Sequence, residues 1–112
     1  DVSFISLQHI LPKIVEISNK NTDIVVLVKP QFEAGKENLE KKGIVKNKKV
    51  HLEILKNLSN YCKLNNLNLL NMDYSPIKGA EGNIEYLAHL KISGSPSEIN
   101  FQNLINKAFE IL

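Results

Sequence analysis

The sequence predicts an α/β fold: a mostly parallel sheet with helices on both faces and an antiparallel hairpin at one edge. Three observations support this. Residues 24–28 are five consecutive aliphatic residues, which is typical of a strand buried on both faces in a parallel sheet. Helical and extended patterns alternate along most of the chain. Two extended patterns then follow one another near the end, as in an antiparallel hairpin.

The expected elements run in the order helix, strand, helix, strand, strand, helix. The first helix, at about 10–18, tolerates Pro12 only in its first turn. The last helix opens with SPSE, in which Ser95, Pro96 and Glu98 form a capping box. Only three strands are expected, so the chain is predicted to supply the second half of a larger sheet. The expected bounds are strands at 23–29, 67–74 and 83–92 and helices at 48–64 and 95–112.

Composition narrows the class of protein. The 112 residues are expected to form one domain, 1–112, and a net charge of +2 is too small to indicate a nucleic-acid binder by itself. The single Cys62 excludes an internal disulfide and favours a reducing, cytoplasmic setting. No apolar run reaches the roughly 20 residues that span a bilayer. The three histidines lack the spacing of metal ligands, so no metal is expected.

Three charged residues are expected at one edge of the sheet. Lys29 follows the buried strand directly, and ligands of open α/β sheets bind at this carboxyl edge. If the last strand runs antiparallel to strand 23–29, Glu85 near its start lies close to Lys29. Asp1 stands where a preceding parallel strand would end. From these residues alone, Lys29 is either a surface lysine or a catalytic group. Glu85 is either an ordinary carboxylate at a strand end or the partner of Lys29 in a catalytic site.

The loop from Pro30 to about Lys46 is too long for a plain connector, so it is functional or disordered. It and the residues after it are rich in lysine. Charge alone leaves a solvated segment and an RNA-binding surface both open. Phe32 and Tyr86 are candidates for stacking on a base, although the apolar face of its strand favours core packing for Tyr86. The lysines in question are Lys36, Lys41, Lys42, Lys46, Lys48 and Lys49.

Four blocks, in this order, carry a resemblance to a known family: DVSFISL, LVKPQFEAG, GIVKN followed by Val50 and His51, and SPIKGAEGNIEYL. Together they resemble the carboxyl-terminal half of the TlyA/hemolysin A-like family of FtsJ-like ribosomal RNA 2'-O-methyltransferases. The resemblance spans about Asp1 to Lys91, and the final helix adds nothing to it. It implies a partial Rossmann-like fold that depends on S-adenosylmethionine. His51 lies in the third block, where it is either a substrate contact or a helix-start residue.

The resemblance implies methyl transfer to a ribose 2'-hydroxyl of ribosomal RNA. Such enzymes use a Lys-Asp-Lys-Glu tetrad, which matches Asp1, Lys29 and Glu85 here as catalytic residues. Asp1 and Phe4 match positions that touch the cofactor. The first lysine and the glycine-rich cofactor loop would lie upstream of residue 1. The RNA contacts would come from Phe32 and the six lysines of the loop and the helix that follows it.

The segment alone is expected to be inactive and to bind S-adenosylmethionine poorly. A lysine acts as a base only when neutral, and adjacent carboxylates favour its charged form. Two alternatives stay open: a hemolysin-like membrane-active protein, and an RNA-binding module without chemistry. The expected partner is ribosomal RNA or a ribosomal subunit rather than a membrane, and the exposed sheet edge would permit a homodimer.

Overall fold

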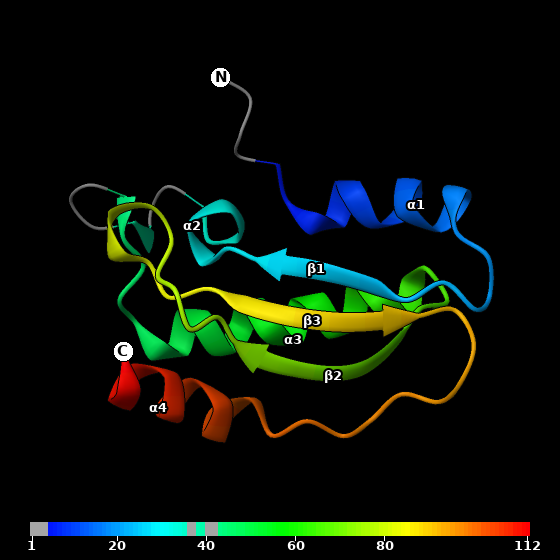
Figure 1. The fold of residues 1–112 in the computed structure, drawn as a ribbon. Coiled ribbons are helices and arrows are strands. Elements are labelled where there is room, and N and C mark those ends of the chain that lie inside the picture. The colour runs from blue at the N-terminus through cyan, green and yellow to red at the C-terminus, as the bar shows by residue number, and fades with distance from the viewer. Residues whose placement is uncertain (1–4, 36–37, 40–42) are drawn as a thin grey trace.

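The computed structural model describes residues 5–35, 38–39 and 43–112. Five predicted site residues lie outside these ranges, namely Asp1, Phe4, Lys36, Lys41 and Lys42. The described chain is a mixed α/β structure (Figure 1). Its elements are α1 (Leu7–Ile17), β1 (Ile24–Val28), α2 (Pro30–Glu33), α3 (Lys48–Leu64), β2 (Asn68–Tyr74), the 3-10 helix η3 (Ala80–Gly82), β3 (Tyr86–Lys91) and α4 (Phe101–Ile111).

The three described strands form one sheet in the order β1-β3-β2, and β3 runs antiparallel to both neighbours. The expected antiparallel pairing of the first and last strands is confirmed. The expected parallel pairing is absent from the described strands, because β3 lies between β1 and β2. Its inward side chains Tyr86, Ala88 and Leu90 are completely buried. A strand that buries this much surface is most stable with a neighbouring strand on each side. Local sequence patterns do not reveal which strands those neighbours are.

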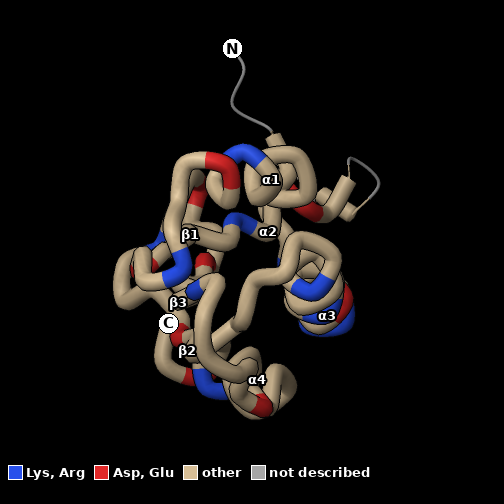
Figure 2. Tube along the Cα trace, turned by 90° about the vertical axis from the view of Figure 1, so that its right-hand side faces the viewer, with Lys and Arg blue, Asp and Glu red and all other residues tan. Residues whose placement is uncertain are grey.

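The described helices lie on one face of the sheet. In Figure 2 the strands stand on one side and α1, α3 and α4 on the other. The opposite face exposes Val25, Leu27 and Leu87, which are 66%, 39% and 37% exposed, and Leu27 pairs directly with Leu87. The expectation of helices on both faces is therefore not met within the described residues, where one face stays open and apolar at its centre.

Two helix starts differ from the prediction. Helix α1 begins at Leu7, because the hydroxyl of Ser6 accepts a hydrogen bond from Gln8 N–H at 3.1 Å. Pro12 therefore lies inside the helix instead of in its first turn. Because Pro12 is exposed, water can satisfy the carbonyl that loses its intrahelical partner. Helix α3, in contrast, occupies the predicted residues 48–64.

The predicted capping box at Ser95, Pro96 and Glu98 is wrong. These residues are not helical, and α4 begins at Phe101 with Asn100 as its cap. Ser97 N–H instead donates to Leu69 O at 2.9 Å, so the linker lies along the outer edge of β2. A hydrogen bond to the sheet replaces the one that the capping box would have made, and it also covers part of an edge strand.

Candidate functional site

Lys29 and Glu85 leave the sheet at the same edge. The last residue pair between β1 and β3 is Val28 with Tyr86, so Lys29 and Glu85 are the next residue of each strand beyond that pair. Lys29 is the N-cap of α2, and its Nζ lies 4.9 Å from the centre of the Phe32 ring. Such a contact stabilises a charged amine. Within the described residues Lys29 forms no ion pair.

The Glu85 carboxylate is held in a buried position. Glu85 is only 5% exposed, and Gln31 Nε2 donates to its Oε2 at 2.8 Å. Gly79 also lies against this carboxylate, and a Cβ atom added there would overlap the carboxyl group. Gly79 has a φ of -81°, which any residue can adopt. The glycine is therefore required by the close approach of Glu85 and not by its backbone conformation.

Helix α2 also fixes the start of α1. The carboxylate of Glu33 accepts hydrogen bonds from Ser6 Oγ at 2.7 Å and from Leu7 N–H at 2.8 Å. A carboxylate at the N-terminus of a helix satisfies free N–H groups and interacts favourably with the helix dipole. Beside this contact lies a cavity of about 270 Å³, which includes Lys29 and Phe32 in its lining. Gln31 thus connects α2 to the residue before β3, and Glu33 connects α2 to the start of α1.

Val45 is held by both of its backbone polar groups. Its N–H donates to Asn83 Oδ1 at 3.0 Å, and its carbonyl lies 2.9 Å from His51 Nε2. Because a carbonyl only accepts, Nε2 carries the proton, and Nδ1 accepts from the Tyr86 hydroxyl at 2.8 Å. Tyr86 is thus a core residue, as expected, and His51 is a buried structural residue. Through these bonds the segment before α3 is attached to the strand that begins beside Glu85.

We expect acid to weaken the fold through His51. Burial lowers the pKa of His51 from its ordinary value of 6.5, so the unfolded chain binds more protons than the folded chain below that pH. The stabilising effect of a neutral His51 is complete above about pH 6.5 and decreases as the pH falls. Urea unfolding should show a smaller free energy of unfolding at pH 5.5 than at pH 7. His51→Gln should remove this dependence, whereas His9→Gln, at an exposed position of α1, should preserve it.

The described lysines of the proposed RNA surface lie at the start of α3. Lys46, Lys48 and Lys49 are all exposed. Lys48 Nζ lies 5.4 Å from the centre of the Phe109 ring and 3.5 Å from Asn106 Oδ1. Figure 2 shows positive charge along α3 as well as at the end of β1. These lysines follow Val45, the residue whose backbone Asn83 and His51 hold in place.

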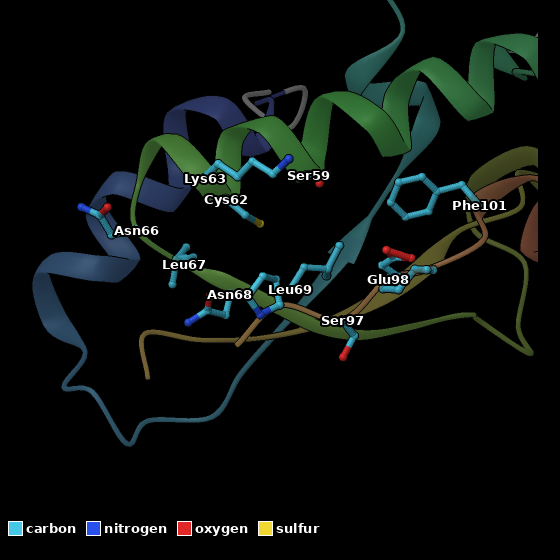
Figure 3. A pocket seen from close by; sticks show the side chains of 12 residues that line it. Ser59, Cys62, Lys63, Asn66, Leu67, Asn68, Leu69, Ser97, Glu98 and Phe101 are labelled. Atoms are coloured by element: carbon cyan, nitrogen blue, oxygen red, sulfur yellow. The ribbon is translucent and has the colours of Figure 1, made fainter. Parts of the chain in front are cut away.

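A larger cavity than the one beside Lys29 lies elsewhere. It has a volume of about 700 Å³ and lies between the last turns of α3, the start of β2 and the linker before α4 (Figure 3). Leu69, which lines it, is opposite Leu90, at the end of the sheet away from Glu85. Cys62, which also lines it, is buried, and burial raises the pKa of its thiol to about 11. A buried thiol with a raised pKa is a poor nucleophile at neutral pH.

The described residues contain neither a candidate membrane span nor a candidate metal-binding cluster. No helix in that part of the chain is long and apolar enough to cross a membrane. In the same ranges no three His, Cys, Asp or Glu residues lie close enough together to bind a metal ion.

The fold and its edge define an α/β protein in which a lysine and a buried carboxylate leave neighbouring strands at the same edge of the sheet. The family model described as FtsJ-like methyltransferase matches residues 1–92. The chain therefore belongs to the FtsJ-like methyltransferase family, and its relatives are those of the TlyA/hemolysin A-like group.

Two relatives and one solved structure show how much of such a protein the chain represents. Hemolysin A of Brachyspira hyodysenteriae is 44% identical over 82% of this chain and 38% of its own length. The 23S rRNA (cytidine-2'-O)-methyltransferase TlyA of Campylobacter jejuni is 42% identical over 77% of this chain and 34% of its own length. A solved structure from Streptococcus thermophilus has a TM-score of 0.89 at 38% identity and covers 99% of this chain and 41% of its own. The chain thus spans between about a third and two fifths of the length of these proteins.

Sequence reasoning missed three residues of this edge, namely Gln31, Gly79 and Asn83. Each has a signal in the sequence. Gln31 lies two positions after Lys29, and Gly79 and Asn83 lie in the same block as Glu85. None of the three carries a net charge, whereas catalytic residues are recognised in a sequence mainly as ionisable groups. Their role follows only from their hydrogen bonds and contacts.

Proposed function

We propose that this chain supplies the second half of an S-adenosylmethionine-dependent ribosomal RNA ribose 2'-O-methyltransferase, with Asp1, Lys29 and Glu85 in its catalytic centre. The observation that supports this most directly is the register of β1 and β3, which brings Lys29 and Glu85 to one edge. The relative from Campylobacter jejuni is named for this reaction on 23S rRNA. The proposed setting is the cytoplasm, where ribosomal RNA is found.

The proposed chemistry requires a base for the ribose hydroxyl, which is a poor nucleophile while it holds its proton. Lys29 takes this proton in the neutral form. Glu85 lies opposite it and orients the amino group and the substrate by accepting hydrogen bonds. The 2'-oxygen would then form a bond to the methyl group that S-adenosylmethionine supplies as the sulfur–methyl bond breaks and S-adenosylhomocysteine leaves, and alignment at short distance is a large part of the rate gain.

S-adenosylmethionine, when bound, supplies a methyl group that is already activated. The described residues do not form a complete pocket for it. The cavity beside Lys29 measures about 270 Å³, below the roughly 300 to 1,000 Å³ of most ligand pockets. The two residues that we assign to the cofactor, Asp1 and Phe4, lie outside the described ranges. Lys29 faces this cavity from the side of β1 and is the described group best placed to meet the cofactor.

The rest of such an enzyme would meet this chain at the open sheet. The relatives are more than twice as long, and β1 has a pairing partner on only one side among the described strands. We infer that a further strand would pair with the free edge of β1 and that helices would cover Val25, Leu27 and Leu87, which completes a three-layer, partly parallel sheet. A homodimer through the same edge is the competing outcome, and the mass of the chain in solution distinguishes the two.

A chimera tests the proposed function. This chain replaces the matching segment of the Campylobacter jejuni relative, and methyl transfer to 23S rRNA is measured with labelled S-adenosylmethionine. We expect an active chimera, and we expect the chain alone to transfer no label. An inactive chimera that still binds RNA would favour a non-catalytic RNA-binding module and would count against the proposal. Leakage of vesicles at micromolar concentrations of the chain would favour the membrane-active alternative.

The lysines before and at the start of α3 are expected to carry part of the RNA affinity. Each contact between a lysine and a phosphate releases counterions, so the affinity falls as salt rises. Changing Lys46, Lys48 and Lys49 to glutamine should reduce the slope of log affinity against log salt by about 2 to 3. Changing three exposed lysines elsewhere, Lys13, Lys20 and Lys63, should leave the slope unchanged. Equal slopes for both triple variants in a filter-binding assay would remove this surface from the proposal.

A further inference from the structure

Gln31 combines two properties that a core residue rarely has together. It is a polar side chain with only 7% exposure, and among the described residues its amide has a hydrogen-bond partner on one side alone. Nε2 donates to Glu85 Oε2 at 2.8 Å. Oε1 is buried and has no hydrogen-bond partner among the described residues. A buried acceptor without a donor destabilises a fold, so stability alone does not explain a glutamine here.

The orientation of this amide follows from its partner. An ionised carboxylate only accepts hydrogen bonds, so the NH₂ group must face Glu85 and the carbonyl must point away. The same carboxylate also lies against Gly79, which leaves no room for a Cβ atom beside Oε2, the oxygen that accepts from Gln31. Glu85 is therefore in contact with both an amide donor and the backbone of the loop that precedes β3. Two contacts from different parts of the chain restrict where its oxygen atoms can lie.

The same short helix carries Gln31 and Lys29. Lys29 is the N-cap of α2, and its carbonyl accepts from Phe32 N–H at 2.8 Å. Pro30 occupies the first position of the helix, where its fixed φ suits a helix start, and its carbonyl accepts from Ala34 N–H at 2.9 Å. The backbone between Lys29 and Gln31 is thus well defined. A hydrogen bond from Gln31 to Glu85 therefore also holds the Glu85 carboxylate near the backbone of Lys29.

From these contacts we infer that Gln31 is a positioning residue, which holds the Glu85 carboxylate at a fixed place relative to the Lys29 amine. This inference rests on the proposed function for its catalytic consequence, but the contact itself does not. Gln31 acts through Glu85, so its effect on the reaction depends on Glu85 being present. Its carbonyl is buried and has no donor among the described residues, in keeping with a site that other groups of such an enzyme complete.

A double-mutant cycle in the chimera tests the catalytic consequence. Gln31→Met removes the donor and keeps the size of the side chain. We expect kcat to fall by about 10- to 100-fold, as for a catalytic group displaced by about 1 Å, while KM for RNA changes less than about two-fold. In a Glu85→Ala background the same substitution should have no further effect, because the residue through which it acts is gone. Gln102→Met serves as the matched control, since Gln102 donates to Asn106 at 3.0 Å on the exposed face of α4.

Stability and spectroscopy distinguish positioning from a structural role. Because Gln31→Met also removes an unsatisfied acceptor, the thermal midpoint of the chimera should move by less than about 4 °C. In the chain itself, Glu85→Gln should shift the side-chain amide NMR signal of Gln31 and leave those of Gln8 and Gln102 in place.

Three results would overturn the inference: an equal loss of kcat with and without Glu85, a large fall in the midpoint that accounts for the lost activity, or an unmoved Gln31 signal. An inactive chimera with the unaltered chain would instead refute the proposed function and the catalytic role of Gln31 with it. The NMR comparison would then still decide whether Gln31 holds Glu85.

Discussion

Changing Lys29 to alanine is expected to abolish methyl transfer by the chimera while RNA binding persists. Loss of a general base typically costs about 10²- to 10⁴-fold in rate, and a fall of on the order of 10³-fold in kcat is expected here. The dissociation constant for RNA should change less than about three-fold, because the phosphate contacts are assigned to the lysines around the start of α3. The measurement is single-turnover methylation together with a gel shift at fixed salt.

An arginine at this position tests the role of the proton. Arginine keeps the positive charge but cannot lose a proton in a protein, so Lys29→Arg should be as inactive as Lys29→Ala. Lys20→Ala, on the short segment that leads into β1, is the control and should retain full activity. Substantial activity in the arginine variant would show that Lys29 contributes charge and not basicity, and the assignment of the base would fall.

The second large effect is expected from one methyl group, added by Gly79→Ala. The new Cβ atom would overlap the Glu85 carboxylate, so Glu85 must move away from its place opposite Lys29. We expect kcat to fall by about 10- to 100-fold with a small change in stability, because a φ of -81° suits alanine. Shortening the acid in the double variant Gly79→Ala/Glu85→Asp should recover part of the loss relative to Glu85→Asp alone.

Gly82→Ala provides the opposite pattern and is the control for this test. No atom lies within 4 Å of a Cβ built there, but Gly82 has a φ of +84°, which alanine adopts only with strain. The expected result is a protein that is less stable by about 1 kcal/mol and keeps its activity. If both glycine variants lost stability and activity in proportion, the loop would act on the fold as a whole and not on Glu85.

The sequence predicts local structure well where local interactions decide it. Helix α3 has the predicted bounds, because Asn47 can cap it and its apolar residues repeat at helical spacing. The start of α4 was mispredicted, because SPSE has the pattern of a capping box but Ser97 bonds to a strand instead. The place of β3 between β1 and β2 depends on which pairing buries the most surface, and no short window of residues contains that information.

The candidate edge likewise contains some residues that the sequence could predict and others that it could not. Lys29 and Glu85 could be predicted to lie together, because strand direction alone decides which residues leave the sheet at the same end. Gln31 and Gly79 could not be predicted. Gln31 matters because it donates a hydrogen bond to Glu85, and Gly79 matters because Glu85 approaches it closely, and neither is a sequence neighbour of Glu85. A sequence names the chemical groups of a site more readily than the neutral residues that hold them.

The separation between the 700 Å³ cavity and the Lys29–Glu85 edge has a practical consequence for inhibitor discovery. A screen that ranks hollows by size would select compounds for the space beside Cys62 and Asn68, at the far end of the sheet. Such compounds would be good structural probes and poor blockers of the reaction. Thiol-directed fragments would fare no better, because a thiol with a pKa of about 11 is almost entirely protonated at neutral pH and reacts slowly.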